Sequence, residues 1–224
     1  MMYLTKFDIN AARRGARYLL GNPQAFHAAV LSSFPPRPTG AGEGRVLWRV
    51  DRNGPHTALY VVSPDEPDLS ALNEQAGWST ATWATRDYRP FLDRISEGQT
   101  WSFRLTANPV KQSLAPETKG MRLAHVTSAQ QAAWLADRAG RNGFRISETS
   151  DGTPAVMVSS RSKDSFSRSD PHRGGRSSRV TLVRVQFDGV LTVNDREKFR
   201  DALVSGFGRG KAYGCGLMTL MRAE

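Results

Sequence analysis

Residues 179–208 read RVTLVRVQFDGVLTVNDREKFRDALVSGFG, and this stretch carries the clearest structural pattern of the sequence. Its first half alternates apolar and polar residues and is rich in valine, which is typical of half-buried strands. Asp188–Gly189 in its middle favours a tight hairpin turn. Asn194 or Asp195 then caps an amphipathic run. The stretch predicts a β-hairpin followed by a helix, and residues 216–223 predict a closing strand.

Weaker patterns of the same kinds precede this stretch. The expected elements are a strand at 99–109 stopped by Pro109, a short strand at 122–126, a helix from Thr127 or Ser128 to 140–143, and strands at 144–148 and 154–160. With the hairpin, helix and closing strand, they describe strands arranged around two helices.

The first part of the chain shows a similar order. The expected elements are a strand at 2–9, a basic loop at 11–17, a helix at 22–33, strands at 45–51 and 56–63, a brief helix at 68–76 and a strand within 77–90. Asn22 and Pro23 form a typical helix start. Strand-helix-strand-strand-helix-strand is the ferredoxin-like order. We therefore predict an α+β protein with two tandem ferredoxin-like domains, 1–92 and 93–224.

The charge balance of the chain points to a polyanionic partner. Lys and Arg number 31 against 21 Asp and Glu, a formal net charge of +10, and arginine far outnumbers lysine. Such an excess attracts phosphates, so nucleic acid is the first partner to consider and an anionic membrane surface the second. Arginine favours nucleic acid because its fork binds phosphate with two hydrogen bonds.

Cysteine content and hydropathy narrow the setting. Cys215 is the single cysteine, which excludes an internal disulfide and a thiolate metal cage. Residues 1–10 lack a secretory signal pattern, and no run approaches the roughly 18 apolar residues of a membrane span. We expect a soluble, cytoplasmic protein with no membrane partner.

Two unusual segments are candidates for binding. Residues 206–217, GFGRGKAYGCGL, do not fit a Walker phosphate loop, because they follow a predicted helix and precede a predicted strand. They form either a tight structural connection or a backbone that approaches nucleic acid closely. Residues 159–179 are basic and rich in serine, which predicts a mobile loop. That loop is either a solvated insertion or a segment that orders on RNA.

His27 is the candidate for chemistry. The four histidines are scattered, and no metal-binding motif or nucleophile elbow occurs. An enzyme with this sequence would therefore rely on acid–base chemistry, for which only histidine has an ordinary pKa near neutrality. Helical spacing alone is equally compatible with a His27 that simply packs.

Seven stretches, taken together and in order, resemble a known family. They are 2–10, 22–35, 47–51, 102–111, 133–146, 185–195 and the glycine-rich 206–220. Their combination resembles the CasE (Cse3) subfamily of CRISPR-associated repeat-processing endoribonucleases from type I-E systems. The resemblance spans the whole chain and is weakest over 64–97 and 159–179.

The resemblance implies an activity and partners. Such proteins bind the hairpin of a CRISPR repeat transcript and cut at its 3′ base without a metal or other cofactor. The upstream 2′-hydroxyl attacks the scissile phosphate, leaving a 2′,3′-cyclic phosphate and a 5′-hydroxyl. They retain the product crRNA and join the other subunits of the Cascade complex. His27 matches the family's general base or acid.

The match departs from some relatives beside this histidine. A tyrosine three residues earlier and a lysine shortly after it are here Gln24 and, approximately, Ser32. Gln24 can donate a hydrogen bond to a phosphate but cannot titrate. Charge in the transition state must then be met elsewhere, and Arg13, Arg14 and Arg37 are candidates.

The same resemblance implies an RNA-binding set. The set includes Arg13, Arg14, Gln24 and Arg37. Its other members are Arg104, Lys111, Arg161, Lys163, Arg168, Arg173, Arg176, Arg179, Arg209 and Lys211. Two other functions stay open at this point. The first is a non-catalytic RNA-binding subunit of a CRISPR complex, in which His27 packs, and the second is a basic ribosome- or DNA-associated protein.

Overall fold

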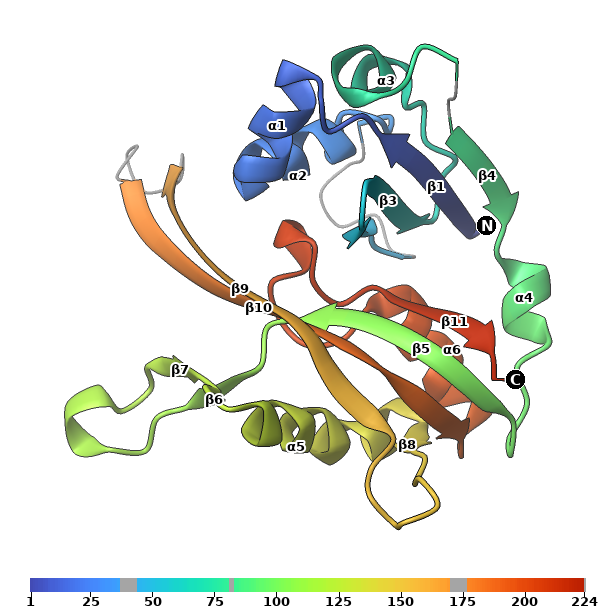
Figure 1. The fold of residues 1–224 in the computed structure, drawn as a ribbon, viewed down its shortest axis with the longest axis vertical. Helices are drawn as coiled ribbons and strands as arrows, with labels where there is room; N and C mark the ends of the chain where they lie inside the picture. The colour runs from blue at the N-terminus through green and yellow to red at the C-terminus, as the bar shows by residue number, and fades with distance from the viewer. Residues whose placement is uncertain (37–43, 81–82, 170–176, 224) are drawn as a thin grey trace.

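The computed structural model describes residues 1–36, 44–80, 83–169 and 177–223. Each half of the chain forms an antiparallel sheet with helices on its outer face, and the inner faces of the two sheets meet (Figure 1). The α+β fold with two tandem ferredoxin-like halves is confirmed. The division of the chain after residue 92 stays a prediction.

The first sheet has four strands in the order β2-β3-β1-β4. Its half comprises β1 (Tyr3–Ile9), α1 (Arg14–Gly21), α2 (Pro23–Leu31), β2 (Leu47–Asn53), β3 (His56–Ser63), α3 (Ser70–Ala76) and β4 (Trp83–Asp87). A buried cluster that includes Phe7, Leu19 and Phe26 joins the helices to this sheet.

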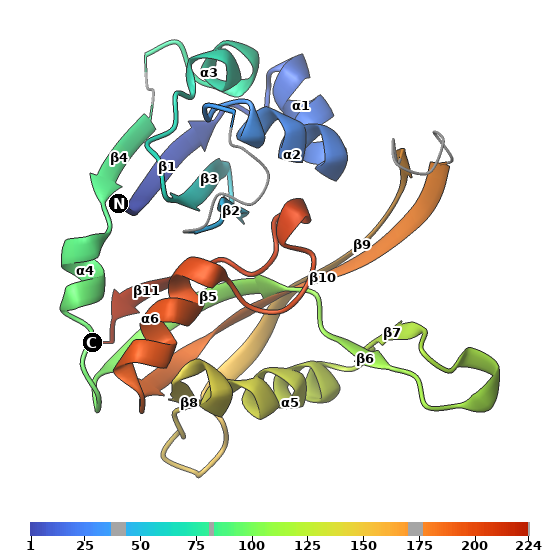
Figure 2. The same cartoon turned by 180° about the vertical axis from the view of Figure 1, so that it is seen from behind.

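Helix α4 (Arg89–Asp93) connects the two halves, and the second sheet has the order β11-β5-β10-β8 with β9 paired to β10. The second half comprises β5 (Thr100–Ala107), β6 (Val110–Gln112), η1 (Pro116–Thr118), β7 (Arg122–Ala124), α5 (Ser128–Ala139), η2 (Gly140–Asn142), β8 (Phe144–Ile146), β9 (Val156–Ser169), β10 (Ser177–Val193), α6 (Arg196–Ser205), η4 (Lys211–Tyr213) and β11 (Met218–Arg222). Helices α5 and α6 cover the outer face of this sheet (Figure 2).

The predicted hairpin turn at Asp188–Gly189 is wrong. Both residues lie inside β10, which continues to Val193 and pairs with β5 from Val185 to Thr192. A Cβ on Gly189 would lie 2.4 Å from the Ala155 carbonyl oxygen. This glycine therefore serves a close approach between backbones rather than a turn.

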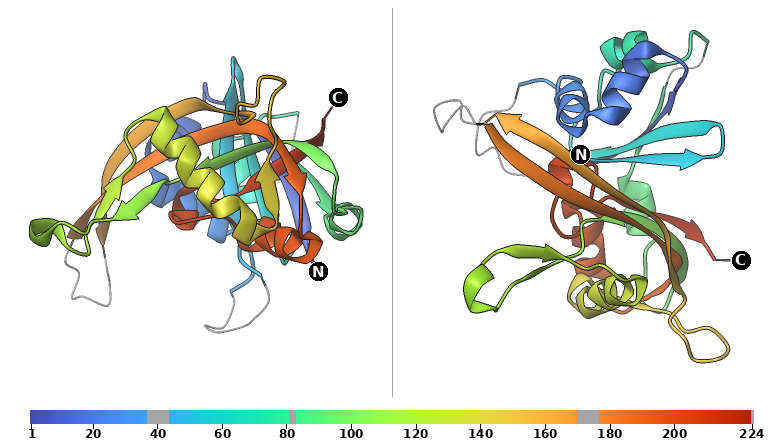
Figure 3. Two further views of the ribbon diagram at one scale, coloured as in Figure 1. Left: turned by 90° about the horizontal axis from the view of Figure 1, so that it is seen from below. Right: turned by 60° about the vertical axis from the view of Figure 1, so that its left-hand side comes forward.

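Two predicted loops are also regular structure. The basic segment 11–17 contains the start of α1 at Arg14, where Gly15 lets the helix approach the backbone of Gln75. The predicted loop 159–179 belongs mostly to β9 and β10, which form a long two-stranded arm (Figure 3). The two strands satisfy each other's backbone hydrogen bonds, so the arm forms despite its serine-rich composition.

A buried arginine joins the two halves. The Arg49 side chain of β2 is 1% exposed and donates to both carboxylate oxygens of Asp51 at 2.6 and 2.8 Å. It also donates to the carbonyl oxygens of Arg104 and Leu217 at 2.8 and 3.0 Å, and to Thr219 Oγ1 at 2.7 Å. All of its donors are used, as a buried guanidinium requires. These hydrogen bonds therefore tie β2 of the first half to β5 and β11 of the second.

Candidate RNA-cleavage site

Helix α2 is anchored at both its start and its buried face. The Asn22 side chain accepts a hydrogen bond from the Ala25 amide, and Pro23 occupies the first helical position. Phe26 is buried and stacks on Trp48 of β2, with ring centroids 4.8 Å apart. This packing fixes the neighbouring His27 relative to the first sheet. The helix start itself is as the sequence predicts.

The glycine-rich loop packs on the same tryptophan. Gly214 has a φ of 78°, and a Cβ there would lie 2.8 Å from Trp48 Cζ3. A side chain at this position would therefore be both strained and in collision. Because α2 and the loop share Trp48, the short helix η4 lies against α2. We call this contact the seam.

His27 and Tyr213 face each other across the seam. Their ring centroids are 6.4 Å apart at an interplanar angle of 62°, and Phe166 of β9 contacts the same Tyr213 ring at 4.9 Å. His27 Nδ1 is buried without a hydrogen-bond partner among the described residues, whereas Nε2 is neither buried nor bonded there. Burial lowers the pKa of His27. The imidazole is therefore mainly neutral at neutral pH, with Nε2 available for proton transfer.

A basic groove begins at Tyr213. Among the described residues its lining contains no carboxylate. It includes five cationic side chains, which are Arg45, Arg122, Arg179, Arg209 and Lys211. Burial and, after it, the nearby charge of Arg45 lower the pKa of Lys211, so the charged form of this lysine is disfavoured in the groove. A phosphate backbone would relieve the repulsion from Arg45. We call this feature the basic groove.

Only part of the predicted RNA-binding set lies in the basic groove. Arg179, Arg209 and Lys211 line it, although Lys211 Nζ also donates to the Ser205 carbonyl oxygen at 2.7 Å. Arg161 and Lys163 line a separate cavity beside α5, where Arg161 donates to Ser128 Oγ at 3.0 Å. Lys111 is exposed on the β6–β7 hairpin.

Two other predicted cations already have protein partners. Arg104 binds Asp188 at 2.6 Å and approaches Asp51 at 3.7 Å, at the junction of the halves. Arg13 donates to the carbonyl oxygens of Asn73 and Gly77 at 3.2 and 3.1 Å, so it ties α1 to α3.

The remaining predicted residues are exposed, buried, or outside the part of the chain that the structure describes. Arg14 is exposed, and Gln24 Oε1 is buried without a partner among the described residues. Arg37, Arg173, Arg176 and the Arg168 side chain lie outside the described residues.

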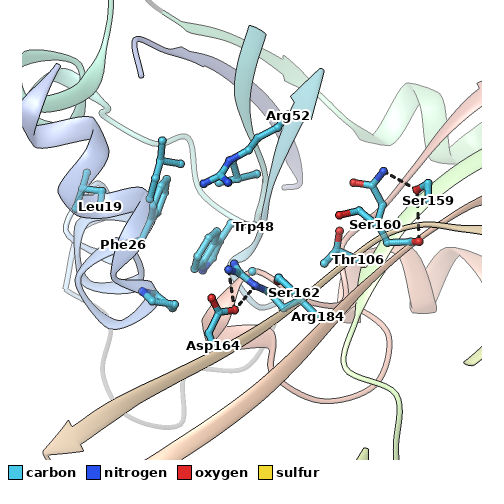
Figure 4. Close-up of a pocket in the computed structure, with 15 residues that line it drawn as sticks. Leu19, Phe26, Trp48, Arg52, Thr106, Ser159, Ser160, Ser162, Asp164 and Arg184 are labelled. Atoms are coloured by element: carbon cyan, nitrogen blue, oxygen red, sulfur yellow. Dashed lines mark hydrogen bonds and ion pairs between the residues drawn. The ribbon is translucent and has the colours of Figure 1, made fainter. Parts of the chain in front are cut away.

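A second cleft separates α1 and α2 from the arm (Figure 4). Leu19 and Phe26 lie on one side, and Ser162 of β9 lies on the other (Figure 4). Its lining has two cations, Arg52 and Arg184, and the charge of Arg184 is largely neutralised by Asp164 at 2.9 Å. The cleft is therefore less suited to a phosphate backbone than the basic groove.

Three residues of the site were not predicted from the sequence. Arg45 and Arg122 line the basic groove from β-strand margins far apart in the chain, and no local pattern connects them. Tyr213 lies inside the glycine-rich segment 206–217. An aromatic residue among glycines is the sequence feature that could have indicated its role.

Metal ligands, the cysteine and the helices of the described residues have the following properties. No group of three or more His, Cys, Asp or Glu side chains gathers there in a way that could hold a metal. Cys215 is buried, and burial raises the pKa of its thiol to about 12. Within the same residues, the helices are too short or too polar to cross a membrane.

The fold and the site define a class of protein: a tandem ferredoxin-like protein with a half-buried histidine beside a basic groove. Residues 2–222 match the family model described as CRISPR associated protein, and the chain belongs to this family. The resemblance to the CasE (Cse3) subfamily is confirmed by two curated relatives.

The first relative is the CRISPR-associated endoribonuclease Cse3 of Thermus thermophilus, 34% identical over 221 residues, covering 98% of this chain and 99% of that protein. The second is the CRISPR system Cascade subunit CasE of Escherichia coli, 28% identical over 227 residues and 98% of each chain. The fold also matches Thermus thermophilus Cse3 bound to an RNA representing a pre-cleavage complex, with a TM-score of 0.77, 32% identity and 98% coverage of both chains.

Proposed function

We propose that this protein is an endoribonuclease that cuts CRISPR repeat transcripts at the base of the repeat hairpin and remains with the crRNA as a Cascade subunit. The observation that carries the proposal is the position of His27, at the seam and next to the basic groove. The full-length similarity to an endoribonuclease and to a Cascade subunit supports the same conclusion. Since the substrate is a transcript, we place the activity in the cytoplasm.

The proposed reaction is a transesterification that needs no metal. His27 Nε2 takes the proton of the 2′-hydroxyl upstream of the cut, and the 2′-oxygen attacks the phosphorus. The bond from phosphorus to the 5′-oxygen breaks, that oxygen takes a proton from water, and the His27 imidazolium returns its proton to solvent. The products are a 2′,3′-cyclic phosphate and a 5′-hydroxyl. A positioned general base typically contributes about 10²–10⁴-fold to such a step.

We propose a division of work between the two halves. Residues 1–92 carry His27, and residues 93–224 carry most of the groove, including Arg179 and Arg209. Dispersed cations suit A-form RNA, which exposes its phosphates and shape more than its base edges. Arg14, Arg37, Lys111, Arg161, Lys163, Arg168, Arg173 and Arg176 are proposed as secondary RNA contacts.

The test is cleavage of a cognate repeat hairpin in excess EDTA, beside the same hairpin with a 2′-deoxy sugar upstream of the cut. We expect the first RNA to be cut and the second to bind but survive. Failure to cut either RNA, with tight binding of both, would instead indicate a non-catalytic RNA-binding subunit. Equal affinity for unrelated duplex DNA would contradict hairpin recognition, because the 2′-hydroxyl and the A-form groove distinguish RNA.

A further inference from the structure

Two buried polar atoms on α2 are without partners, and they lie on the same face of the helix. Gln24 Oε1 and His27 Nδ1 are both buried and unbonded among the described residues. Their positions are three residues apart, and side chains at this spacing are neighbours on a helix surface. An acceptor and a possible donor, both unmet, therefore stand side by side.

We propose that Gln24 is a positioning residue for His27: its side-chain oxygen accepts a hydrogen bond from Nδ1–H and thereby keeps Nε2 unprotonated. A hydrogen bond between the two side chains would satisfy both atoms, and leaving buried polar groups unpaired is unfavourable. The neutral imidazole then has its lone pair on Nε2, the atom that is neither buried nor bonded within the described part of the chain. This is the tautomer that a general base requires, so the inference rests on the proposed function and deepens it.

No neighbouring charged or titratable side chain among the described residues binds His27 in place of Gln24. On α1, β2 and η4, which pack against α2, the charged and titratable side chains besides the mutually paired Arg49 and Asp51 are Arg14, Arg17, Tyr18, Arg52, Lys211 and Tyr213. None of them forms a hydrogen bond or ion pair with His27 in the described part of the chain. Tyr213 meets the imidazole edge-on as a ring contact. Once Nε2 has taken a proton, the Gln24 oxygen remains an acceptor for Nδ1–H and stabilises the imidazolium.

The direct test is the tautomer itself, read from ring ¹⁵N chemical shifts of the full-length protein labelled at histidine. The chain has four histidines, so the spectrum is sparse, and loss of one signal set in His27→Ala assigns it. We expect the neutral His27 ring to carry its proton on Nδ1, and Gln24→Leu to shift it toward the Nε2–H form. The exposed His56 is an internal control that should not change.

The opposite result is equally clear. Nε2–H as the main tautomer of the unaltered protein would overturn the proposal, because the amide NH₂ would then face Nδ1. An unchanged tautomer in Gln24→Leu would overturn it as well. Neither measurement needs RNA, so a correct tautomer in a protein that does not cut would contradict the proposed function but not this inference.

Kinetics supply a second readout. We expect Gln24→Leu to lower kcat about ten-fold with little change in KM, well short of the loss that follows removal of a charged orienting group. Gln24→Glu should restore the Nδ1–H tautomer and raise the His27 pKa, moving the acidic limb of the rate profile to higher pH. Gln112→Leu, at an exposed position on β6, is the matched control and should leave both properties unchanged. An unmoved limb in Gln24→Glu would count against the proposal.

Discussion

The seam and the basic groove share the glycine-rich loop but use their residues in different ways. The seam places one half-buried histidine against one tyrosine, with both supporting elements packed on Trp48. The groove spreads its cations over strands and loop, and several of them are exposed. Chemistry at the seam therefore depends on single atoms in a fixed geometry, whereas binding in the groove is shared. The effects of substitutions in the two regions should therefore differ in size and in the quantity that changes.

The largest expected effect comes from His27→Ala at the seam. Without the proposed base, the cleavage rate at saturating RNA should fall by about 10²–10⁴-fold. Hairpin affinity should stay within about two-fold, because the groove carries the binding energy. Single-turnover cleavage and a binding titration at one salt concentration measure the two quantities. A large loss of affinity would erase the distinction between seam and groove.

Gly214→Ala should have the next largest effect. The new Cβ would lie 2.8 Å from Trp48 Cζ3, which displaces the loop and with it Tyr213 from His27. Misplacement by about 1 Å can cost about 10²-fold in rate. Gly98→Ala is the matched control, because Gly98 has a similar φ of 82° with nothing within 4 Å. Cleavage by Gly214→Ala as fast as that by Gly98→Ala would mean that the Trp48 contact does not set the position of the loop.

Arg209→Ala should have a smaller effect on a different quantity. Arg209 is exposed in the groove, so its loss should weaken hairpin binding several-fold and reduce the slope of log affinity against log salt by about one. The cleavage rate at saturating RNA should not change. Arg222→Ala, at the exposed end of β11, is the control for net charge. An equal loss in both variants would show that overall charge, and not the groove, binds the RNA.

The smallest expected effect is a shift of the acidic limb in the pH profile of kcat/KM, to lower pH than for a histidine of ordinary pKa. Burial lowers the pKa of His27 below its ordinary value of 6.5. Since the neutral ring acts as base, kcat/KM should rise with pH through this lowered pKa and be level by neutral pH. The limb should vanish in His27→Ala, measured from about pH 4.5 to 8. A limb centred above 6.5 would place the acting group elsewhere.

The same contrast explains what could be predicted from the sequence. Helix α2 and the place of His27 were predicted because Asn22 and Pro23 define the helix start locally. The groove was predicted only in part, because Arg45 precedes β2 and Arg122 begins β7, and no local sequence pattern connects these distant positions.

The wrong predictions have the same cause. Gly189 resembled a turn because a sequence does not distinguish a glycine that turns the chain from one that admits the Ala155 carbonyl. The arm resembled a loop because its order comes from the ladder between β9 and β10 and not from its composition.

The five hydrogen bonds of Arg49 have a consequence for how this fold can be rearranged. Its partners are Asp51 in its own half and the Arg104, Leu217 and Thr219 positions in the other. Expressed alone, either half would lack the hydrogen-bond partners that the other half supplies at this junction. A chimaera that exchanges one half for that of a relative must therefore keep a hydroxyl at position 219 and the carbonyls of positions 104 and 217 in place opposite Arg49. Recombination within the family is restricted at this junction more than at the exposed arm.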